Sequence, residues 1–345
     1  MKYLLISLLT FSTLFIGCNS EECDLVTPPI DDRIPFEINF LQYSDNNFFI
    51  DQVYTDTSAD FNMFNKFYGS LTPIVLPKYF IKNIEVYKSV NSIFDVDLSI
   101  IAIAYINLPP RSSDSMYGDS YRNNNIQIAG EVELSRFVLL NYGVDYVFNP
   151  FTGNINLLSE ISNNEILAVA YVIENDSPGE SDDLYYGEFI SELVNNSKTR
   201  GVLKLVKPQN LQPAFENAWN LKMKNLYQIA PYIGQVTDLD LDIYLKKSDG
   251  TESNTINNIR LLELFGFDRL NESAMPIPDG KFDNRRGFNI QTTTSEIIFP
   301  VIQPFGNNIP FILNEYKYQA IYDTMKTFLS MPGNSFIIKG KFNPI

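Results

Sequence analysis

The sequence of 345 residues contains no histidine, only two cysteines and a single tryptophan. Without histidine the chain cannot form a Ser-His-Asp or Cys-His nucleophilic site or an HExxH zinc site. No two glycines have the GxG spacing, so the dinucleotide fingerprint is missing, and the P-loop pattern is missing as well. A hydrolase that uses two carboxylates stays open, because 41 acidic residues always permit some pair, but no spacing singles one out. We therefore expect a protein that is not an enzyme.

Positive charge is also scarce, since 26 basic residues face 41 acidic ones and leave a net charge of −15. Such a surface repels nucleic acid and anionic lipid headgroups, so no nucleic-acid partner is expected. Aromatic residues are abundant instead, with 20 tyrosines and 26 phenylalanines, and this composition favours strands and turns over helices.

The N-terminus has the layout of a secretory signal, in which one lysine precedes an apolar run over residues 3–16. This run is shorter than the ~20 residues that a membrane-spanning helix needs. Residues 14–18 read LFIGC and resemble a bacterial lipobox, which implies a covalent lipid on Cys18. The alternative is an ordinary signal that is cleaved elsewhere, with Cys18 incidental. We expect residues 1–17 to be a signal peptide and 18–35 a lipidated, flexible tether.

Acidic residues follow the cysteine directly, and Ser20, Glu21, Glu22 and Asp24 resemble the tract that carries Bacteroidetes lipoproteins to the cell surface. A solvated run of charge is the plainer interpretation. The other cysteine, Cys23, has no partner in the chain if Cys18 is lipidated. It is then a second acyl site, a free thiol or an unpaired residue in a linker.

Period-two alternation and apolar runs predict strands at several places, among them 36–40, 81–87, 100–106, 165–171 and 336–342. The run 100–106 is almost continuously apolar, which predicts burial on both faces. Residues 144–157 predict a hairpin around a turn that contains Gly153. Residues 238–244 alternate carboxylates with apolar side chains, as on a half-solvated strand. The stretch 111–125 reads as a polar loop.

Two stretches show helical spacing instead. One runs from Leu211 through Phe215, Trp219 and Met223 to residue 226, and the other covers residues 314–329. At a helix position Trp219 is expected in the core, and a sugar-stacking platform is the alternative. We predict an α+β fold that is predominantly β, with antiparallel, sandwich-like sheets, a few packed helices and no complete transmembrane barrel. The expected regions are 36–235 and 236–345.

From about residue 78 onward, a series of motifs stands in a characteristic order. They are IEVY (84–87), IAIAYINL (101–108), DYVFNP with TG (145–153), NEILAVAY (164–171), YGEF (186–189), LKLVK (203–207), WNLKMKNLY (219–227), FDRLN (267–271), PDGKFD (278–283) and EIIFPVIQPFG (296–306). In this order they resemble the N-terminal-type domain of the SprA (Sov) family, the outer-membrane translocon of type IX secretion and gliding motility. The resemblance covers roughly three-quarters of the chain, and Gln303 stands where the family usually has an acidic residue.

The resemblance implies a place at the outer membrane and protein partners from the secretion and motility machinery. SprA proteins build a very large barrel and are not generally lipoproteins. This chain ends at Ile345, just past one such domain, so we expect it to lack the barrel and to depend on Cys18 for its place in the membrane. The expectation is an outer-membrane lipoprotein, on the cell surface, that acts by binding proteins.

Asp268, Asn271, Asp279 and Asp283 surround a turn with Pro278 and Gly280. Oxygen ligands around a glycine turn are what Ca²⁺ prefers, although the spacing differs from an EF-hand. The alternative is a tight turn in which these side chains accept backbone hydrogen bonds. No other cofactor is expected.

Three further interpretations remain open beside the leading one. They are a surface glycan-binding β-sandwich lipoprotein, a truncated or split piece of a SprA translocon, and a hydrolase. The oligomeric state is not indicated by the sequence.

Overall fold

The computed structural model describes residues 31–344 except 59, 91–98, 113–114, 177–178, 180–181, 197, 199 and 231–235. Residues Ile34–Ile345 form one compact unit. Several antiparallel sheets and short helices build it, which confirms the predicted fold class. Among the described residues, no helix is long and apolar enough to cross a membrane. The predicted leader, the tether as far as residue 30, Cys18 and Cys23 lie outside the described part.

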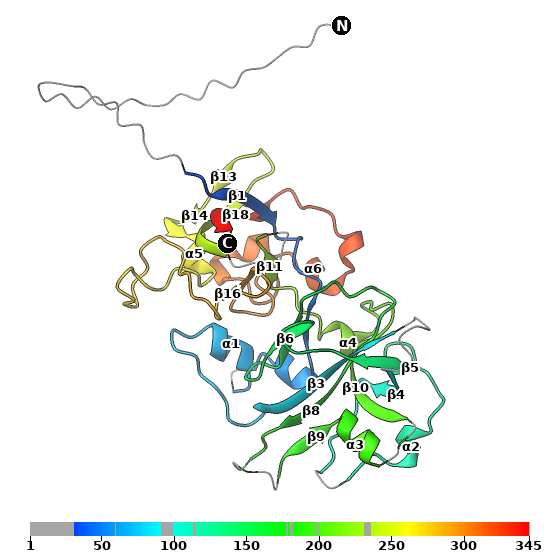
Figure 1. Cartoon of the computed structure of the whole chain (residues 1–345). Coiled ribbons are helices and arrows are strands. Elements are labelled where there is room, and N and C mark those ends of the chain that lie inside the picture. Colours follow the sequence, from blue (N-terminus) through cyan, green and yellow to red (C-terminus); the bar gives the residue numbers. More distant parts are fainter. Residues whose placement is uncertain are drawn as a thin grey trace, which may run out of the picture. The chain divides into compact units, whose positions relative to one another are not determined.

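The largest sheet has the strand order β10-β4-β5-β3-β8-β9 and closes on itself, because β10 also pairs with β8 (Figure 1). Its strands are β3 (Ile81–Ser89), β4 (Ser99–Tyr105), β5 (Val132–Leu139), β8 (Leu167–Ile173), β9 (Leu184–Tyr186) and β10 (Gly201–Lys207). Only the β10–β4 pair is parallel. Every residue of β8 and β10 is buried.

Strand β4 differs from the prediction of burial on both faces. Only Ala102, Ile103 and Ala104 are buried within it, and Ile101 is 38% exposed. Strand β4 pairs with β5 and β10, whereas the fully buried β8 pairs with β3, β9 and β10. The apolar run over residues 100–106 therefore predicted a strand correctly, but the strand that is buried throughout is β8.

A second sheet has the order β1-β18-β12-β13 and consists of β1 (Ile34–Asn39), β18 (Ser335–Pro344), β12 (Val236–Lys246) and β13 (Glu252–Ser253). Burial alternates along β12 from Asp238 to Leu245, which confirms the predicted half-solvated strand. Among the described residues, the first strand thus pairs with the last one, with Ile34 opposite Phe342.

Three smaller sheets complete the β structure. They are β2 (Asn47–Phe49), β7 (Asn154–Leu157) and β6 (Tyr146–Asn149); β11 (Leu226–Gln228), β17 (Glu296–Ile298) and β16 (Ile290–Gln291); and β14 (Thr255–Ile256) with β15 (Ile259–Arg260). The β6–β7 pair is the predicted hairpin. Gly153 ends its turn with φ +63°, and a Cβ there would lie 2.2 Å from the Tyr54 ring. Only glycine fits this position.

The helices are short: α1 (Met63–Tyr68), α2 (Asp119–Arg122), α3 (Ile190–Asn195), α4 (Glu216–Trp219), α5 (Leu261–Leu264), α6 (Ala320–Asp323), and the 3₁₀ turns η1 (Gln52–Thr55), η3 (Phe311–Tyr316) and η4 (Lys326–Phe328). Both predicted long helices are wrong in extent. The only helix in residues 211–226 is α4, because the chain beyond it bonds to β2, where Met223 N donates to Asn47 O. Residues 314–329 divide into part of η3, α6 and η4.

Two large apolar clusters form the core. One gathers the closed sheet, α1, β2 and β7. The other joins β12, β17 and β18 through phenylalanines that meet mostly edge to face, as Phe265 does with Phe299 and Phe336. Aromatic pairs in this geometry add to the stability from burial alone. Many of the phenylalanines in the sequence therefore lie in the core.

Candidate functional site

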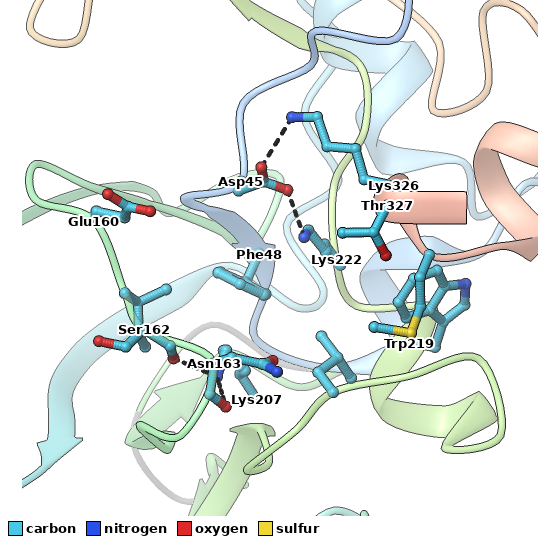
Figure 2. A pocket seen from close by; sticks show the side chains of 13 residues that line it. Asp45, Phe48, Glu160, Ser162, Asn163, Lys207, Trp219, Lys222, Lys326 and Thr327 are labelled. Atoms are coloured by element: carbon cyan, nitrogen blue, oxygen red, sulfur yellow. Dashed lines mark hydrogen bonds and ion pairs between the residues drawn. The ribbon is translucent and has the colours of Figure 1, made fainter. Parts of the chain in front are cut away.

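A cavity of about 570 Å³ opens where segments that are distant in the sequence meet (Figure 2). Residues 45–48 before and within β2, residues 160–163, the end of β10, the α4 region and η4 each contribute to its wall. The lining residues are Asp45, Phe48, Glu160, Ile161, Ser162, Asn163, Lys207, Leu211, Trp219, Lys222, Met325, Lys326 and Thr327. We call this cavity the lysine pocket, because three of its side chains are lysines.

Two of the lysines share one carboxylate. Asp45 Oδ1 lies 2.6 Å from Lys222 Nζ, and Asp45 Oδ2 lies 2.9 Å from Lys326 Nζ. Burial by itself raises the pKa of the Asp45 carboxyl, but the charges and hydrogen bonds of Lys222 and Lys326 outweigh it and hold the pKa below its usual value. Tyr43 lies next to both ammonium groups, with its ring centroid 4.4 Å from Lys326 Nζ. The pair of cations therefore carries one positive charge in excess of Asp45.

Lys207 lies at the end of β10 and meets carbonyl groups instead of a carboxylate. Its Nζ donates to the carbonyls of Ser162 at 3.0 Å, Asn163 at 3.2 Å and Glu165 at 2.6 Å. Burial, and secondly the charge of Lys222, lower the pKa of Lys207 to about 8. This lysine fixes the loop before β8 as one wall of the pocket, and its remaining charge adds to that of Lys222.

Trp219 forms part of another wall and is buried, as predicted for a core residue. Its Nε1 donates to the Tyr322 carbonyl, and Lys224 Nζ donates to the same oxygen at 2.9 Å. Lys224 Nζ also lies 3.8 Å from the centre of the Trp219 ring system, a cation–π contact. Burial, followed by the charge of Lys222, lowers the pKa of Lys224 to about 7.

The lysine pocket thus combines positive charge with an apolar floor. Phe48, Ile161, Leu211 and Met325 supply the floor, and Lys222 and Lys326 lie at its side. Three lysines face two carboxylates, Asp45 and Glu160, in the lining, so the pocket is locally positive on a chain of net charge −15 and favours an anionic group. An anion attached to apolar side chains, as in an acidic peptide segment, matches both parts of the lining.

The predicted calcium ligands lie in one loop, where all four accept hydrogen bonds from the backbone. Asp268 accepts hydrogen bonds from the N–H groups of Asp279 and Gly280, each at 2.9 Å, and Asp268 is only 1% exposed. Asp283 accepts from residues 269 and 270, Asp279 from residues 272 and 281, and Asn271 from residues 273 and 275. These are the bonds of the alternative interpretation, a tight turn, and calcium binding stays a prediction.

The structure brings a different acidic group together, namely Glu174, Asp182 and Asp183, whose carboxylate oxygens lie within 4.8 Å of one another. Lys82 Nζ approaches two of them, at 3.2 Å from Glu174 Oε2 and 2.8 Å from Asp183 Oδ2. A lysine therefore supplies the positive charge at this cluster.

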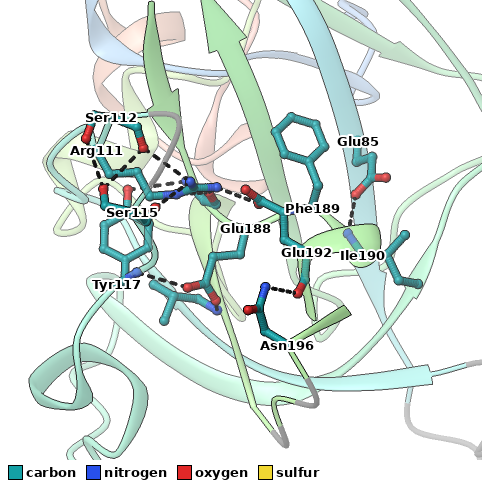
Figure 3. Close-up of polar contacts among 12 residues, drawn as sticks. Glu85, Arg111, Ser112, Ser115, Tyr117, Glu188, Phe189, Ile190, Glu192 and Asn196 are labelled. Carbon is teal, nitrogen blue, oxygen red and sulfur yellow. Dashed lines mark hydrogen bonds and ion pairs between the residues drawn. The ribbon is translucent and has the colours of Figure 1, made fainter. Parts of the chain in front are cut away.

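The stretch 111–125, predicted as a polar loop, contains α2 and two buried arginines. Arg111 Nη2 lies 2.5 Å from Glu192 Oε2 and 3.0 Å from the Gly187 carbonyl (Figure 3). Arg122 binds both oxygens of Glu188, which is fully buried at the end of the segment after β9. Glu188 also accepts from the N–H groups of Tyr117 and Val202. These bonds attach the segment around Arg111 and Arg122 to the closed sheet. Each of the two buried arginines has a carboxylate partner, as a buried charge requires.

Sequence reasoning missed the residues of the lysine pocket. Lys222 lies inside the WNLKMKNLY motif, where the lysines at 222 and 224 alternate with Leu221 and Met223, and this was the available signal. Asp45 and Lys326 lie 177 and 104 residues from it, so only the fold joins them. No protein-family model matches the chain, and no sequence among the curated proteins matches it either. The resemblance to SprA accordingly rests on the ordered motifs alone.

Proposed function

We propose that this chain is an outer-membrane lipoprotein related to the SprA translocon, and that it serves type IX secretion or gliding motility by binding other proteins. It is not catalytic in this proposal. The lipobox at Cys18 and the acidic tract behind it support the outer-membrane, cell-surface location. The ten ordered motifs support the relation to SprA.

The observation that carries the binding role is the lysine pocket. Its lining places Lys222 and Lys326 beside one carboxylate and an apolar floor, and the chain around it is strongly acidic. An acidic peptide segment of a partner protein, with an apolar side chain beside its carboxylate, would displace Asp45 from one lysine and fill the floor. Attraction between opposite charges then directs the encounter, and the apolar contacts hold the complex.

Affinity purification from detergent-solubilised outer membranes tests the proposal. The tagged, lipidated protein is expected to retain components of the secretion machinery, identified by mass spectrometry. Lys222→Gln with Lys326→Gln is expected to lower the recovery about tenfold, because a charge pair at an interface contributes on the order of 1 kcal/mol or more. Lys198→Gln with Lys247→Gln removes the same charge from exposed positions and serves as the control.

Two results would contradict the proposal. Recovery of no secretion component from membranes that contain them would remove the binding role. Equal losses in the pocket variant and the control would show that the lysine pocket is not the site.

Glycan binding is the second candidate, and the presence of Trp219 in the pocket wall favours it. Trp219 is only 7% exposed and Lys224 covers one face of the indole, so only the small part of the ring that lines the pocket is available to a sugar. Tight binding of an oligosaccharide that Trp219→Leu abolishes, with no protein recovered, would establish this role instead.

A further inference from the structure

The segment between α1 and β3 is strongly apolar and yet exposed. Residues 71–77 read LTPIVLP and run along the outside of the ribbon beside α1 (Figure 1). Leu71 is 41% exposed, Ile74 52% and Val75 44%. Three aliphatic side chains held in water within five residues are costly, and contiguous exposure of this kind marks an interaction surface.

Phenylalanine rings extend this surface beyond the loop. Phe67 on α1 stacks on Phe151 and on Phe288, each pair with centroids 5.7 Å apart, and Phe80 contacts Phe151. All four rings are only partly buried. The Leu71 carbonyl accepts a hydrogen bond from Arg285 Nη2 at 2.8 Å, so the loop and the segment before β16 are joined. We call residues 71–77 with these four rings the apolar loop surface.

Cations border the apolar loop surface. The guanidinium carbon of Arg285 lies 4.6 Å from the centre of the Phe288 ring, and Arg286 beside it is exposed. Lys66 precedes Phe67 on α1 and is joined to the loop through its backbone, because its carbonyl accepts the Ile74 N–H. Within the described part of the chain, none of these three side chains forms an ion pair. An apolar strip with unpaired cations at its border therefore interrupts a surface that is acidic overall.

We propose that the apolar loop surface rests on a lipid bilayer, with the aliphatic side chains among the upper acyl chains and the cations at anionic headgroups. Apolar area and attraction to anionic lipids are the two contributions that hold a peripheral protein in the interface. Pro73 and Pro77 lack N–H donors, so the loop does not offer a continuous strand edge to a partner protein. Bilayer contact needs no such edge.

The proposed lipid anchor brings the folded body close to the bilayer but does not determine which of its surfaces contacts the lipid. The stretch from Cys18 to Arg33 spans at most about 55 Å when extended, so a lipid on Cys18 keeps the body near the bilayer and leaves open which face meets it. The inference relies on the proposed function only for this proximity. The experiment below removes the anchor, so that either claim can fail without the other.

Vesicle co-sedimentation of the mature chain from residue 18 with Cys18→Ser tests the contact in the absence of leader and lipid. At about 0.15 M salt, where the Debye length of about 8 Å screens the charges away from the contact, the protein is expected to sediment with vesicles of phosphatidylcholine and phosphatidylglycerol (7:3). Binding to phosphatidylcholine alone is expected to be weaker, by about fivefold for each cation that meets an anionic headgroup. Leu71→Ser with Ile74→Ser and Val75→Ser is expected to lower the partition coefficient about 100-fold, since each side chain loses roughly half of its full burial energy.

The matched control is Phe311→Ser with Phe328→Ser, because these rings are 90% and 75% exposed and lie outside the apolar loop surface. Circular dichroism establishes that each variant is folded. Failure of the parent chain to bind either vesicle, or equal losses in the control, would overturn the proposal. Self-association through residues 71–77 without vesicle binding would likewise overturn it and assign the surface to a second copy of the chain.

Discussion

Replacing Lys224 with methionine is expected to stabilise the protein near neutral pH and to change how its stability depends on pH. Burial lowers the pKa of Lys224 from 10.5 to about 7 in the folded chain. Between these two values the unfolded chain binds a proton that the folded chain does not, so the free energy of unfolding rises with pH, by up to ~1.4 kcal/mol per unit. From pH 7 to pH 9 this single group accounts for about 2 kcal/mol.

Methionine suits the test because it keeps the length of the side chain and carries no charge. The Tyr322 carbonyl keeps a donor in the variant, because Trp219 Nε1 also binds it. Lys224→Met should therefore exceed the parent in stability at pH 7, and this advantage should shrink by about 2 kcal/mol at pH 9.

Urea unfolding at pH 7, 8 and 9 measures the difference, with the fluorescence of Trp219, the sole tryptophan, as the signal. Lys247→Met, at an exposed position, is the control and should give a curve parallel to the parent. Parallel curves for Lys224→Met and the parent would refute the reasoning, because they would mean that Lys224 stays protonated when folded.

Three other substitutions test different parts of the account. Arg122→Met leaves the fully buried Glu188 without its cation and should cost about 3–5 kcal/mol in thermal unfolding. Adding Glu188→Gln, which removes the charge and keeps an acceptor for the N–H groups of Tyr117 and Val202, should restore part of the loss; no recovery would argue against an unpaired charge as the cause. Gly153→Ala should cost more than ~1 kcal/mol, and more than Gly143→Ala, whose φ of +78° is strained too but whose Cβ would meet nothing within 4 Å; equal costs would remove the clash with the Tyr54 ring as a factor. Cys18→Ser combined with Leu71→Ser, Ile74→Ser and Val75→Ser, which also removes the proposed bilayer contact, should move the folded chain into the soluble fraction, and retention in the membrane would contradict an attachment through Cys18 and that contact alone.

The sequence predicted strands well where one face of the strand is solvated, because apolar and polar residues then alternate. Along β12 the carboxylates of Asp238, Asp240 and Asp242 point away from a core that Leu239, Leu241 and Ile243 enter, as period two requires. The turn at Gly153 was predictable for a similarly local reason. Such patterns need only the neighbouring residues to be interpreted.

The helical spacing of residues 211–226 gave a wrong helix length, because hydrogen bonds to distant segments determine the backbone conformation there. Phe215, Trp219 and Met223 do enter the core, but a strand-like bridge between Lys222 and Phe48 holds the chain extended beyond α4. The lysine pocket could not be predicted from any window of sequence, since its cations come from segments that meet only through β2, β10 and η4. Buried Arg111 and Arg122 escaped notice for the same reason, because a charged stretch looks solvated until its partners are known.

Photocrosslinking in intact cells tests the central claim most directly. A photoreactive residue at Thr327, which is exposed and lines the lysine pocket, is compared with one at the exposed Thr251 near β13. The account predicts a crosslink from position 327 to a component of the secretion machinery, weakened by Lys222→Gln with Lys326→Gln, and none from position 251. A crosslink to that component from position 251 alone, or no protein adduct at 327, would contradict binding at the lysine pocket.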